Sequence, residues 1–164
     1  MKQPRSGCPI NAAVEALGDH WSLLVLRDVI FGDRRYFREL QAGSIEGIAS
    51  NVLADRLKKL VTAGILSREG AARGSRVRYS LTEAGIQTLP IIFALGNWGL
   101  DWRDGTRELR IRQELMRHDG QRFIEEFMDD LRVQHLGAAP TKRQGPGPFE
   151  RLSAAYKQAT RGLD

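Results

Sequence analysis

The sequence has few of the features that mark secreted, disulfide-stabilised or membrane proteins. Its 164 residues include one cysteine, Cys8, so it can form neither an internal disulfide nor a cysteine-rich zinc site. No apolar run approaches the ~20 residues that span a membrane. The N-terminal stretch MKQPRSGCPI also lacks the apolar centre of a signal peptide. We therefore expect a cytoplasmic protein that has no membrane partner.

The sequence also lacks the short motifs of common enzyme classes. It contains no phosphate-binding loop, no dinucleotide fingerprint, no HExxH zinc site and no nucleophile elbow. Its 3 histidines are scattered, and few other reactive groups lie near them in the sequence. The acidic residues of QRFIEEFMDDLRVQHL fall opposite the apolar ones, as on a solvated helix face. We therefore expect no enzyme, no bound metal and no other cofactor.

Basic residues, in contrast, are in excess. The chain has 25 Lys and Arg against 20 Asp and Glu, which gives a net charge of +5 at pH 7. Such a balance favours a polyanionic partner without identifying it. Because 41% of the residues are hydrophobic, the chain can also bury a core.

The stretch Ile48–Leu66, IASNVLADRLKKLVTAGIL, has the pattern of an amphipathic helix that ends before Gly64. Leu53, Leu57 and Leu60 recur at helical spacing and predict a face that enters a core. The residues that point away from this face include Asn51, Asp55, Lys58 and Lys59. Small and polar residues come first and basic ones later, as in helices that read the major groove of DNA. The alternative is an ordinary surface helix that only covers a core.

The segments on either side of this helix complete a recognisable pattern. A short helix over 36–42 precedes it across the glycine-bounded link 43–47, and two helices joined in this way are typical of a helix-turn-helix. Farther along, three residues expected in solvent alternate with three expected in the core: Arg76, Arg78 and Ser80 with Val77, Tyr79 and Leu81. This alternation predicts a strand, and the tip Gly70–Gly74, which contains Arg73, predicts a hairpin. We expect a mainly α fold with a small β-hairpin wing, which is a winged helix-turn-helix.

Further helices are predicted before and after this motif. The first two cover 9–17 and 21–31, and Asp19 is placed to cap the second. Thr82 can cap a later helix, which Pro90 either kinks or begins afresh. The apolar surface of that helix is larger than a small winged helix can cover, so we expect part of it to form a dimer interface. The alternative is that the C-terminal part of the chain covers it.

The composition changes after the winged helix. One modest helix is predicted over 107–116, ending near Gly120, and a clearly amphipathic one over 121–136. A Pro/Gly-rich linker follows, and the segment from Phe149 is either a weak helix or a mobile tail. The domains predicted from these patterns are a winged helix-turn-helix and dimerisation domain over 8–102, a helical extension over 103–137, and a linker and tail over 138–164.

Six motifs follow one another between Cys8 and Gly99 without large gaps: CPI, GDHWSLLVLRDVIFG, RRYFREL, EGIASNVLADRLKKLVTAGIL, YSLTEAG and NWG. Together they resemble the HxlR-type winged helix-turn-helix transcriptional regulators of bacteria. The sequence departs from the family where Tyr36 and Phe37 replace the arginine-phenylalanine pair that is common before Glu-Leu. The resemblance implies a homodimeric DNA-binding regulator in which N-terminal and long C-terminal helices pack across the two-fold axis.

A homodimer of this kind would place two copies of the Ser50–Lys59 helix in successive major grooves of a double-stranded DNA operator, roughly one helical turn apart. We expect base contacts from Ser50 and from Asn51, whose amide can bond bidentately to adenine. Asp55 then pairs with a base or with a neighbouring arginine. Phosphate contacts are expected from Arg34, Arg35, Arg38, Arg56, Lys58 and Lys59. The wing residues Arg73, Arg76 and Arg78 are expected to reach the DNA backbone or the minor groove.

Cys8 has two interpretations in such a regulator, for which repression is the expected mode. In several family members the cysteine before this proline senses oxidants or electrophiles, and the resemblance extends that role to Cys8. Lys2 and Arg5 lie near it in the sequence and favour a thiolate. Alternatively, Cys8 is a small apolar residue that fixes the N-terminus.

Two other functions stay open at this stage. In the first, a small-molecule inducer binds between the long helix and the C-terminal helices, in a pocket lined by Trp98, Trp102, Phe123 and Phe127. In the second, the winged helix is a protein-interaction module that reads no DNA sequence.

Overall fold

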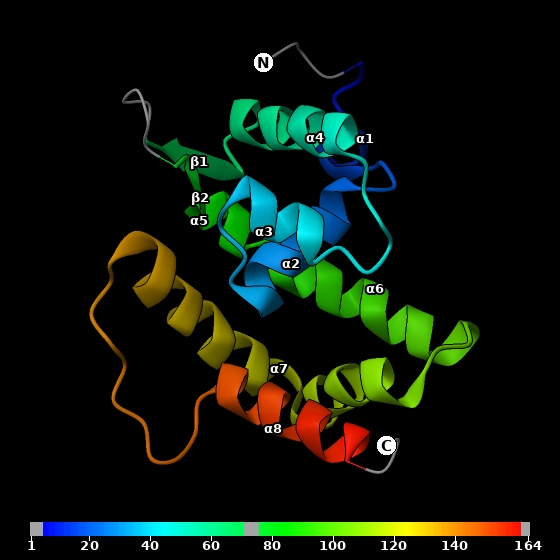
Figure 1. Ribbon diagram of the computed structural model, residues 1–164, viewed down its shortest axis with the longest axis vertical. Helices are drawn as coiled ribbons and strands as arrows, with labels where there is room; N and C mark the ends of the chain where they lie inside the picture. The colour runs from blue at the N-terminus through cyan, green and yellow to red at the C-terminus, as the bar shows by residue number, and fades with distance from the viewer. Residues whose placement is uncertain (1–4, 71–75, 162–164) are drawn as a thin grey trace. The chain divides into compact units, whose positions relative to one another are not determined.

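The structure is a computed structural model that describes residues 5–70 and 76–161 (Figure 1). The chain divides into two compact units, Met1–Ile86 and Gln87–Asp164, which we call the N-terminal unit and the C-terminal unit. The predicted fold class, mainly α with a small β-hairpin wing, is confirmed. In the described part of the chain, no helix has the length and the apolar character needed to cross a membrane.

The N-terminal unit contains the predicted helix-turn-helix and the hairpin. Its elements are α1 (Pro9–Leu17), α2 (Ser22–Gly32), α3 (Phe37–Ala42), α4 (Ser50–Thr62), β1 (Leu66–Glu69), β2 (Arg78–Leu81) and α5 (Glu83–Ile86). Helices α3 and α4 form the helix-turn-helix, and the two strands form the wing. The sequence pattern therefore predicted the order and the type of these elements.

The core of the N-terminal unit lies between the inner faces of α2 and α4. Leu26 and Val29 of α2 are fully buried, and so are Leu53, Leu57 and Leu60 of α4. Each buried leucine contributes ~1.5–3 kcal/mol relative to an exposed one. The leucine spacing thus fixes the rotation of α4 about its own axis, and the opposite side of the helix faces solvent.

The ends of these helices follow from particular residues. The Asp19 carboxylate accepts the backbone N–H groups of Trp21 and Ser22, at 2.9 and 2.8 Å, which confirms its predicted role at the start of α2. After the end of α4, Gly64 has a φ of 71°, a left-handed conformation that side chains other than glycine adopt with strain. The reversal at Gly64 directs the chain into β1.

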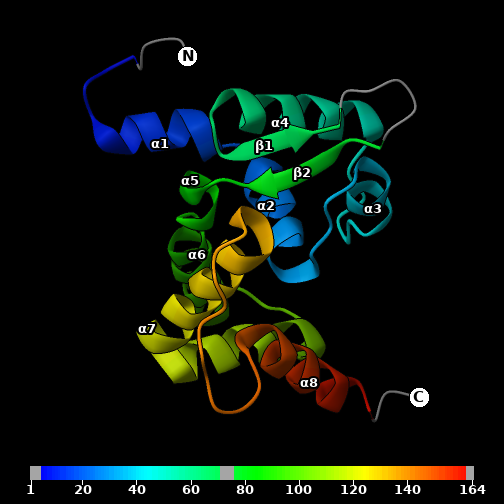
Figure 2. The ribbon, with the colours of Figure 1, turned by 90° about the vertical axis from the view of Figure 1, so that its left-hand side faces the viewer.

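The wing is an antiparallel pair in which Leu66 lies opposite Leu81, and β1 contacts α4 (Figure 2). The Tyr79 N–H donates to the Arg35 carbonyl at 2.8 Å, so β2 is also bonded to the segment before α3. The prediction that Ser80 faces solvent is wrong, since Ser80 is 1% exposed. Its hydroxyl accepts a hydrogen bond from the guanidinium of Arg35, a residue that is itself buried.

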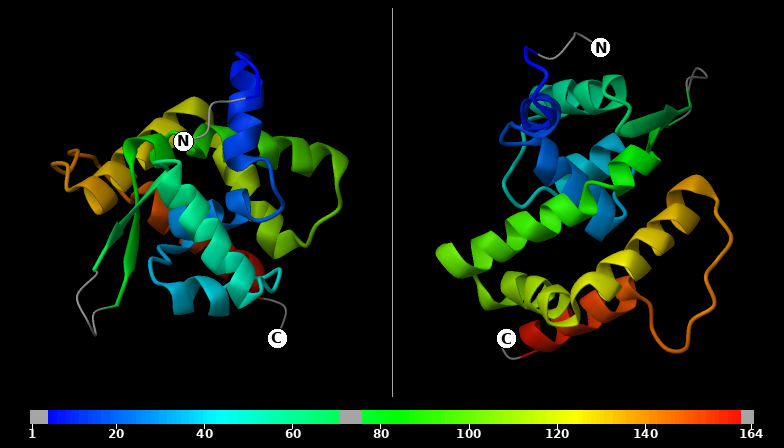
Figure 3. Two further views of the ribbon diagram at one scale, coloured as in Figure 1. Left: turned by 90° about the horizontal axis from the view of Figure 1, so that it is seen from above. Right: turned by 180° about the vertical axis from the view of Figure 1, so that it is seen from behind.

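The C-terminal unit consists of three helices, α6 (Leu89–Trp102), α7 (Arg107–Leu136) and α8 (Pro148–Thr160). Helix α6 begins afresh at Leu89, with Pro90 in its first turn, which is one of the two predicted outcomes. Helix α7 runs as two segments that meet at Gly120, whose φ of 67° interrupts the helix (Figure 3). The predicted helix end near Gly120 is therefore confirmed. The structure groups the long helix α6 with α7 and α8, whereas the sequence pattern predicts a division after residue 102.

Helix α8 packs against α7 and forms the rest of the C-terminal core. Phe123 and Phe127 of α7 are fully buried, and Leu152 of α8 is buried. The guanidinium of Arg112 on α7 lies 4.2 Å from the ring centroid of Tyr156 on α8. The segment from Phe149 is thus a docked helix, the first of the two predicted outcomes for it.

One side of α6 is covered by α7 and another is exposed. The Gln113 amide of α7 donates to the Phe93 carbonyl and to the Asn97 side chain, at 3.1 and 2.9 Å. It crosses α6 at Gly96, where a Cβ would lie 2.3 Å from the Gln113 Oε1 atom. On the exposed side, four apolar residues recur at spacings of four, three and four: Ile91, Leu95, Trp98 and Trp102. We call these four residues the α6 stripe.

Candidate nucleic-acid interface

The exposed side of α4 is the candidate surface for reading DNA. Asn51, Asp55, Lys58 and Thr62 recur at i, i+4, i+7 and i+11, which places them on one stripe of the helix. With their exposed neighbours they form what we call the reading face: Ser50, Asn51, Ala54, Asp55, Lys58 and Thr62. Ala54 and Thr62 were missed in the sequence, although the same helical period predicts their exposure. Alanine is small enough for a close approach, and its methyl group can contact a thymine methyl.

Among the residues of α4 that we expected to bind phosphate, Lys58 differs from Lys59 and Arg56. Lys58 is exposed and has no ion-pair partner in the part of the chain that the structure describes. Lys59 donates to the Asp19 carboxylate at 2.8 Å, and Arg56 lies 3.1 Å from the same carboxylate. Arg56 also bonds Asp55, so the acidic residue has taken the arginine partner that was one of its two predicted options.

Asp19 is ionised in this arrangement. Burial by itself raises the pKa of the Asp19 carboxyl, but hydrogen bonds outweigh it. They come from the Lys59 ammonium, from the Ser22 hydroxyl, and from the backbone N–H groups of Trp21 and Ser22. The net effect holds the pKa of Asp19 well below its ordinary value, so the carboxylate keeps its charge at neutral pH.

The three arginines before and within α3 have different surroundings. Arg34 lies 3.2 Å from the Asp28 carboxylate, and its guanidinium covers Gly43. Arg35 is 4% exposed and bonds atoms of β2. Desolvation lowers the pKa of the Arg35 guanidinium from its ordinary value. Arg38 is exposed and has no ion-pair partner within the described residues. Of the three, Arg38 is the one whose charge is open to a phosphate in this conformation.

The wing presents further exposed arginines. Arg76 and Arg78 are exposed, as predicted from the alternation, and Arg68 of β1 is exposed as well. The sequence did not predict the exposure of Arg68, because clear alternation of polar and apolar residues is present only in the second strand. Arg73 lies outside the described residues.

Cys8 is exposed and occupies the position that caps α1. Its carbonyl accepts the Ala12 N–H at 3.1 Å. Arg5, which was expected to favour a thiolate, donates instead to the Glu15 carboxylate at 2.8 Å. Lys2 lies outside the described residues.

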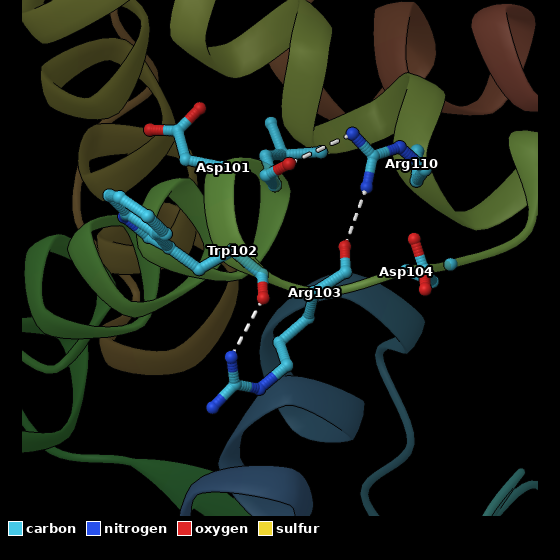
Figure 4. A pocket seen from close by; sticks show the side chains of 7 residues that line it. Asp101, Trp102, Arg103, Asp104 and Arg110 are labelled. Atoms are coloured by element: carbon cyan, nitrogen blue, oxygen red, sulfur yellow. Dashed lines mark hydrogen bonds between the residues drawn. The ribbon is translucent and has the colours of Figure 1, made fainter.

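The aromatic residues expected to line an inducer pocket are not gathered around one cavity. Phe123 and Phe127 form an edge-on pair inside the α7 and α8 core, whereas Trp98 and Trp102 are exposed on α6. A cavity of about 480 Å³ lies at the turn after α6 (Figure 4). There the Arg110 guanidinium donates to the carbonyls of Leu100 and Arg103, at 3.0 and 3.1 Å, and so closes the end of α6. The cavity is lined mainly by polar groups of this turn, so it differs from the apolar pockets that bind small molecules.

Comparisons with known proteins agree with this geometry. The family model described as HxlR-like helix-turn-helix matches residues 16–107 of the chain. An HTH-type transcriptional regulator of Synechocystis is 38% identical over 96 residues, which are 58% of this chain and 70% of the relative. The HTH-type transcriptional regulator YvaP of Bacillus subtilis is 31% identical over 99 residues, which are 59% of this chain and 90% of YvaP.

A solved structure with a similar fold is the redox regulator HypR, known in an oxidised and a reduced form. The oxidised form has a TM-score of 0.51 at 28% identity and covers 60% of this chain and 100% of HypR. The reduced form has a TM-score of 0.51 at 27% identity. The residues matched by the family model contain α4, both strands of the wing and α6, so the surface described above lies within the matched part of the chain.

Proposed function

The chain belongs to the HxlR-like helix-turn-helix family of transcription regulators, which are not enzymes, and from this premise we propose that it represses transcription as a sequence-specific, DNA-binding homodimer in the cytoplasm. The observation that carries the proposal is the reading face of α4. Its residues are exposed and lie opposite the buried leucines of the second helix of a helix-turn-helix, which is the helix that enters the major groove in this motif.

The bases are read by the first turns of α4 in this proposal. Asn51 has an exposed amide with no bond to another described residue, and an amide can pair with the N6 and N7 atoms of adenine. Ser50 lies beside it and can donate to or accept from a base edge. Asp55 is part of the reading face, and its carboxylate forms a salt bridge with Arg56.

The phosphates are bound by exposed basic residues that have no acidic partner. Within the described residues these are Lys58 of α4, Arg38 of α3, and Arg68, Arg76 and Arg78 of the wing. We add Arg73 from its place in the sequence between the two strands. Arg35 is assigned a structural role, since its guanidinium is buried beneath β2.

The dimer forms in part through the α6 stripe. Its alternating spacings of four and three are those of a helix that packs along a second helix with a shared apolar seam. The stripe is rich in aromatic residues, which interfaces favour. Exposed Ile10 and Val14 give α1 a similar apolar face, so both helices that the family resemblance implicates in dimerisation have one.

We also propose that oxidation of Cys8 controls DNA binding. An exposed thiol at the start of α1 supports it, and so does the similarity to a redox regulator. Oxidation in this proposal changes the packing of α1 across the dimer and thereby the spacing of the two reading faces. Diamide should then change operator affinity in the wild type and leave the Cys8→Ser variant unaffected. An equal response of both proteins would remove Cys8 from the mechanism.

The test of DNA reading is a fluorescence-anisotropy titration of the reduced full-length protein at fixed physiological salt. One duplex comes from upstream of its own and adjacent genes, and the control duplex has the scrambled sequence. A specific regulator should prefer the native duplex by ~10³-fold or more. Equal, weak and salt-sensitive binding to both duplexes would contradict sequence reading. Absence of binding to either duplex, together with stable capture of a protein partner, would indicate a protein-interaction module.

A further inference from the structure

A single carboxylate joins the start of α2 to the reading helix. The Oδ1 atom of Asp19 accepts the N–H groups of Trp21 and Ser22. The Oδ2 atom accepts the Ser22 hydroxyl at 2.6 Å and the Lys59 ammonium at 2.8 Å. The Nη1 atom of Arg56 lies 3.1 Å from the same Oδ2. Two basic side chains of α4, Arg56 and Lys59, thus contact the carboxylate of Asp19, which lies outside the helix-turn-helix.

Because of this arrangement, two adjacent lysines of α4, Lys58 and Lys59, have different surroundings. The Lys59 side chain is 31% exposed and is bonded to Asp19, whereas Lys58 is exposed and lacks an acidic partner in the described part of the chain. Arg56 lies one helical turn before Lys59 and is bonded to Asp19 and Asp55. The salt dependence of DNA binding comes from counterions condensed on the DNA, which are released when a lysine or arginine neutralises a phosphate. A cation that stays bonded to a carboxylate of its own protein neutralises no phosphate. It therefore adds little to the salt dependence of DNA binding.

We propose that Asp19 is a positioning residue for DNA binding, which holds Arg56 and Lys59 against α2 and competes with DNA phosphates for both cations. The proposal rests on the DNA-binding function proposed above. Two consequences follow from the geometry. The bonds to Asp19 add to the buried leucines in holding the reading face of α4 outward. The number of phosphates that α4 neutralises is also smaller than its number of basic residues.

The variant Asp19→Asn isolates the charge. Its amide oxygen can still accept the two backbone N–H groups of α2, but the negative charge that holds Arg56 and Lys59 is gone. Lys59 is then free to contact phosphates, and Arg56 keeps only its bond to Asp55. Phosphates are the same in every sequence. Affinity for any duplex should therefore become more dependent on salt, and preference for the native duplex should fall.

The experiment measures the slope of log K against log salt for the full-length protein, with a duplex of scrambled sequence. Lys58→Gln and Lys59→Gln are compared in the wild-type and in the Asp19→Asn background. Glu46→Gln is the charge-matched control, because Glu46 pairs with Arg27 in the same unit, at 2.6 Å, and forms no ion pair with α4 among the described residues. We expect Lys58→Gln to lower the slope by about one in both backgrounds.

For Lys59→Gln, the expected change is below about 0.3 in the wild type and about one in the Asp19→Asn background. Asp19→Asn alone should raise the slope by about one to two, and Glu46→Gln by less than about 0.5. Two results would overturn the proposal: a Lys59→Gln effect as large as that of Lys58→Gln in the wild type, or equal slopes for Asp19→Asn and Glu46→Gln. If Asp19→Asn does not fold, the two lysine variants in the wild type still decide the question.

A second measurement does not depend on DNA and so separates this proposal from the proposed function. In urea unfolding, Lys59→Gln should lower the midpoint in the wild type and leave it unchanged in the Asp19→Asn background. An equal midpoint shift in both backgrounds would show that the two residues are uncoupled, which overturns the positioning role. If the coupling is present and no duplex is bound at any salt concentration, the DNA-binding function fails and the link between α2 and α4 stands.

Discussion

The N-terminal and C-terminal units have similar numbers of basic residues, but they differ in how many of these residues are paired with acids. The N-terminal unit has 13 Arg and Lys against 9 Asp and Glu, and the C-terminal unit has 12 against 11. In the C-terminal unit, most arginines are bonded to acids of the same unit, as in the pairs Arg117–Asp101, Arg122–Glu126, Arg143–Asp130 and Arg151–Asp119. In the N-terminal unit, five exposed basic residues have no acidic partner among the described residues: Arg38, Lys58, Arg68, Arg76 and Arg78.

The difference shows why net charge is a poor guide to a DNA-binding surface. Arg34, Arg35, Arg56 and Lys59 belong to the helix-turn-helix or adjoin it, yet all four are committed to partners within the protein. A cation whose charge a carboxylate already balances gains less from contact with a phosphate than an unpaired cation does. The candidate interface is therefore identified by basic side chains that are exposed and have no acidic partner among the described residues. The number of positive charges alone does not locate it.

The largest expected effect concerns the apolar surface of the C-terminal unit. Leu95→Glu would place a charge in the α6 stripe, and an unpaired charge buried at an interface costs about 3–5 kcal/mol. The dimer should dissociate into monomers in analytical ultracentrifugation at micromolar protein, while Ala154→Glu, which adds the same charge to an exposed site on α8, should remain dimeric. A Leu95→Glu protein that stays dimeric would show that another surface holds the two copies together.

A smaller effect is expected on the reading face of the N-terminal unit. Asn51→Ala removes an amide that can bond a base, so the preference for the native over the scrambled duplex should fall by about 1–3 kcal/mol. Gln121→Ala deletes an exposed amide in the C-terminal unit and should leave that preference unchanged. Equal loss of affinity for both duplexes in the Asn51 variant would mean that Asn51 does not read the sequence.

A third prediction compares one arginine from each unit. Arg76→Gln removes an unpaired charge from the wing, so binding to both duplexes should weaken alike and the salt slope should fall by about one. Arg117 is bonded to Asp101 at 2.6 Å, so Arg117→Gln should change the slope by less than about 0.3. Equal slopes for the two variants would break the distinction between paired and unpaired arginines.

The smallest effect is on acid stability, and it depends on Asp19. Its pKa is lowered in the folded protein, so its contribution to stability is present above the pKa of the unfolded chain, about 4. That contribution is lost as the pH falls through the lower pKa of the folded state. The stability difference between wild type and Asp19→Asn should therefore be constant from pH 7 to pH 5 and shrink below about pH 4. A difference that does not change down to pH 2.5 in urea titrations would contradict the assignment.

Much of the fold could be predicted because local patterns determine it. Helical spacing of leucines identified α4, Gly64 and Gly120 marked helix ends, and Pro90 marked the start of α6. These signals act over one or two turns, so they can be read without knowledge of the tertiary structure. The exposed position of Asn51 follows from the same period.

The remaining features depend on contacts between residues that are distant in the sequence. Alternation along β2 placed Ser80 in solvent, but the guanidinium of Arg35 covers it from another element. Asp19 was identified as a helix cap, and nothing in the sequence indicated that it also bonds Lys59 of α4. A basic side chain at a helical flank can serve either a phosphate or a distant carboxylate, and the sequence pattern is the same in both cases.

The most direct test of the central claim uses the small number of lysines in the chain. Lys58 lies on the reading face, and Lys142 and Lys157 are exposed in the C-terminal unit. Lysine acetylation rates of the full-length protein would be measured by mass spectrometry, with and without a saturating native duplex. We predict that the duplex slows acetylation of Lys58 several-fold and leaves Lys142 and Lys157 unchanged. Protection of Lys142 or Lys157 with no change at Lys58 would contradict the account, since it would place the DNA on the C-terminal unit.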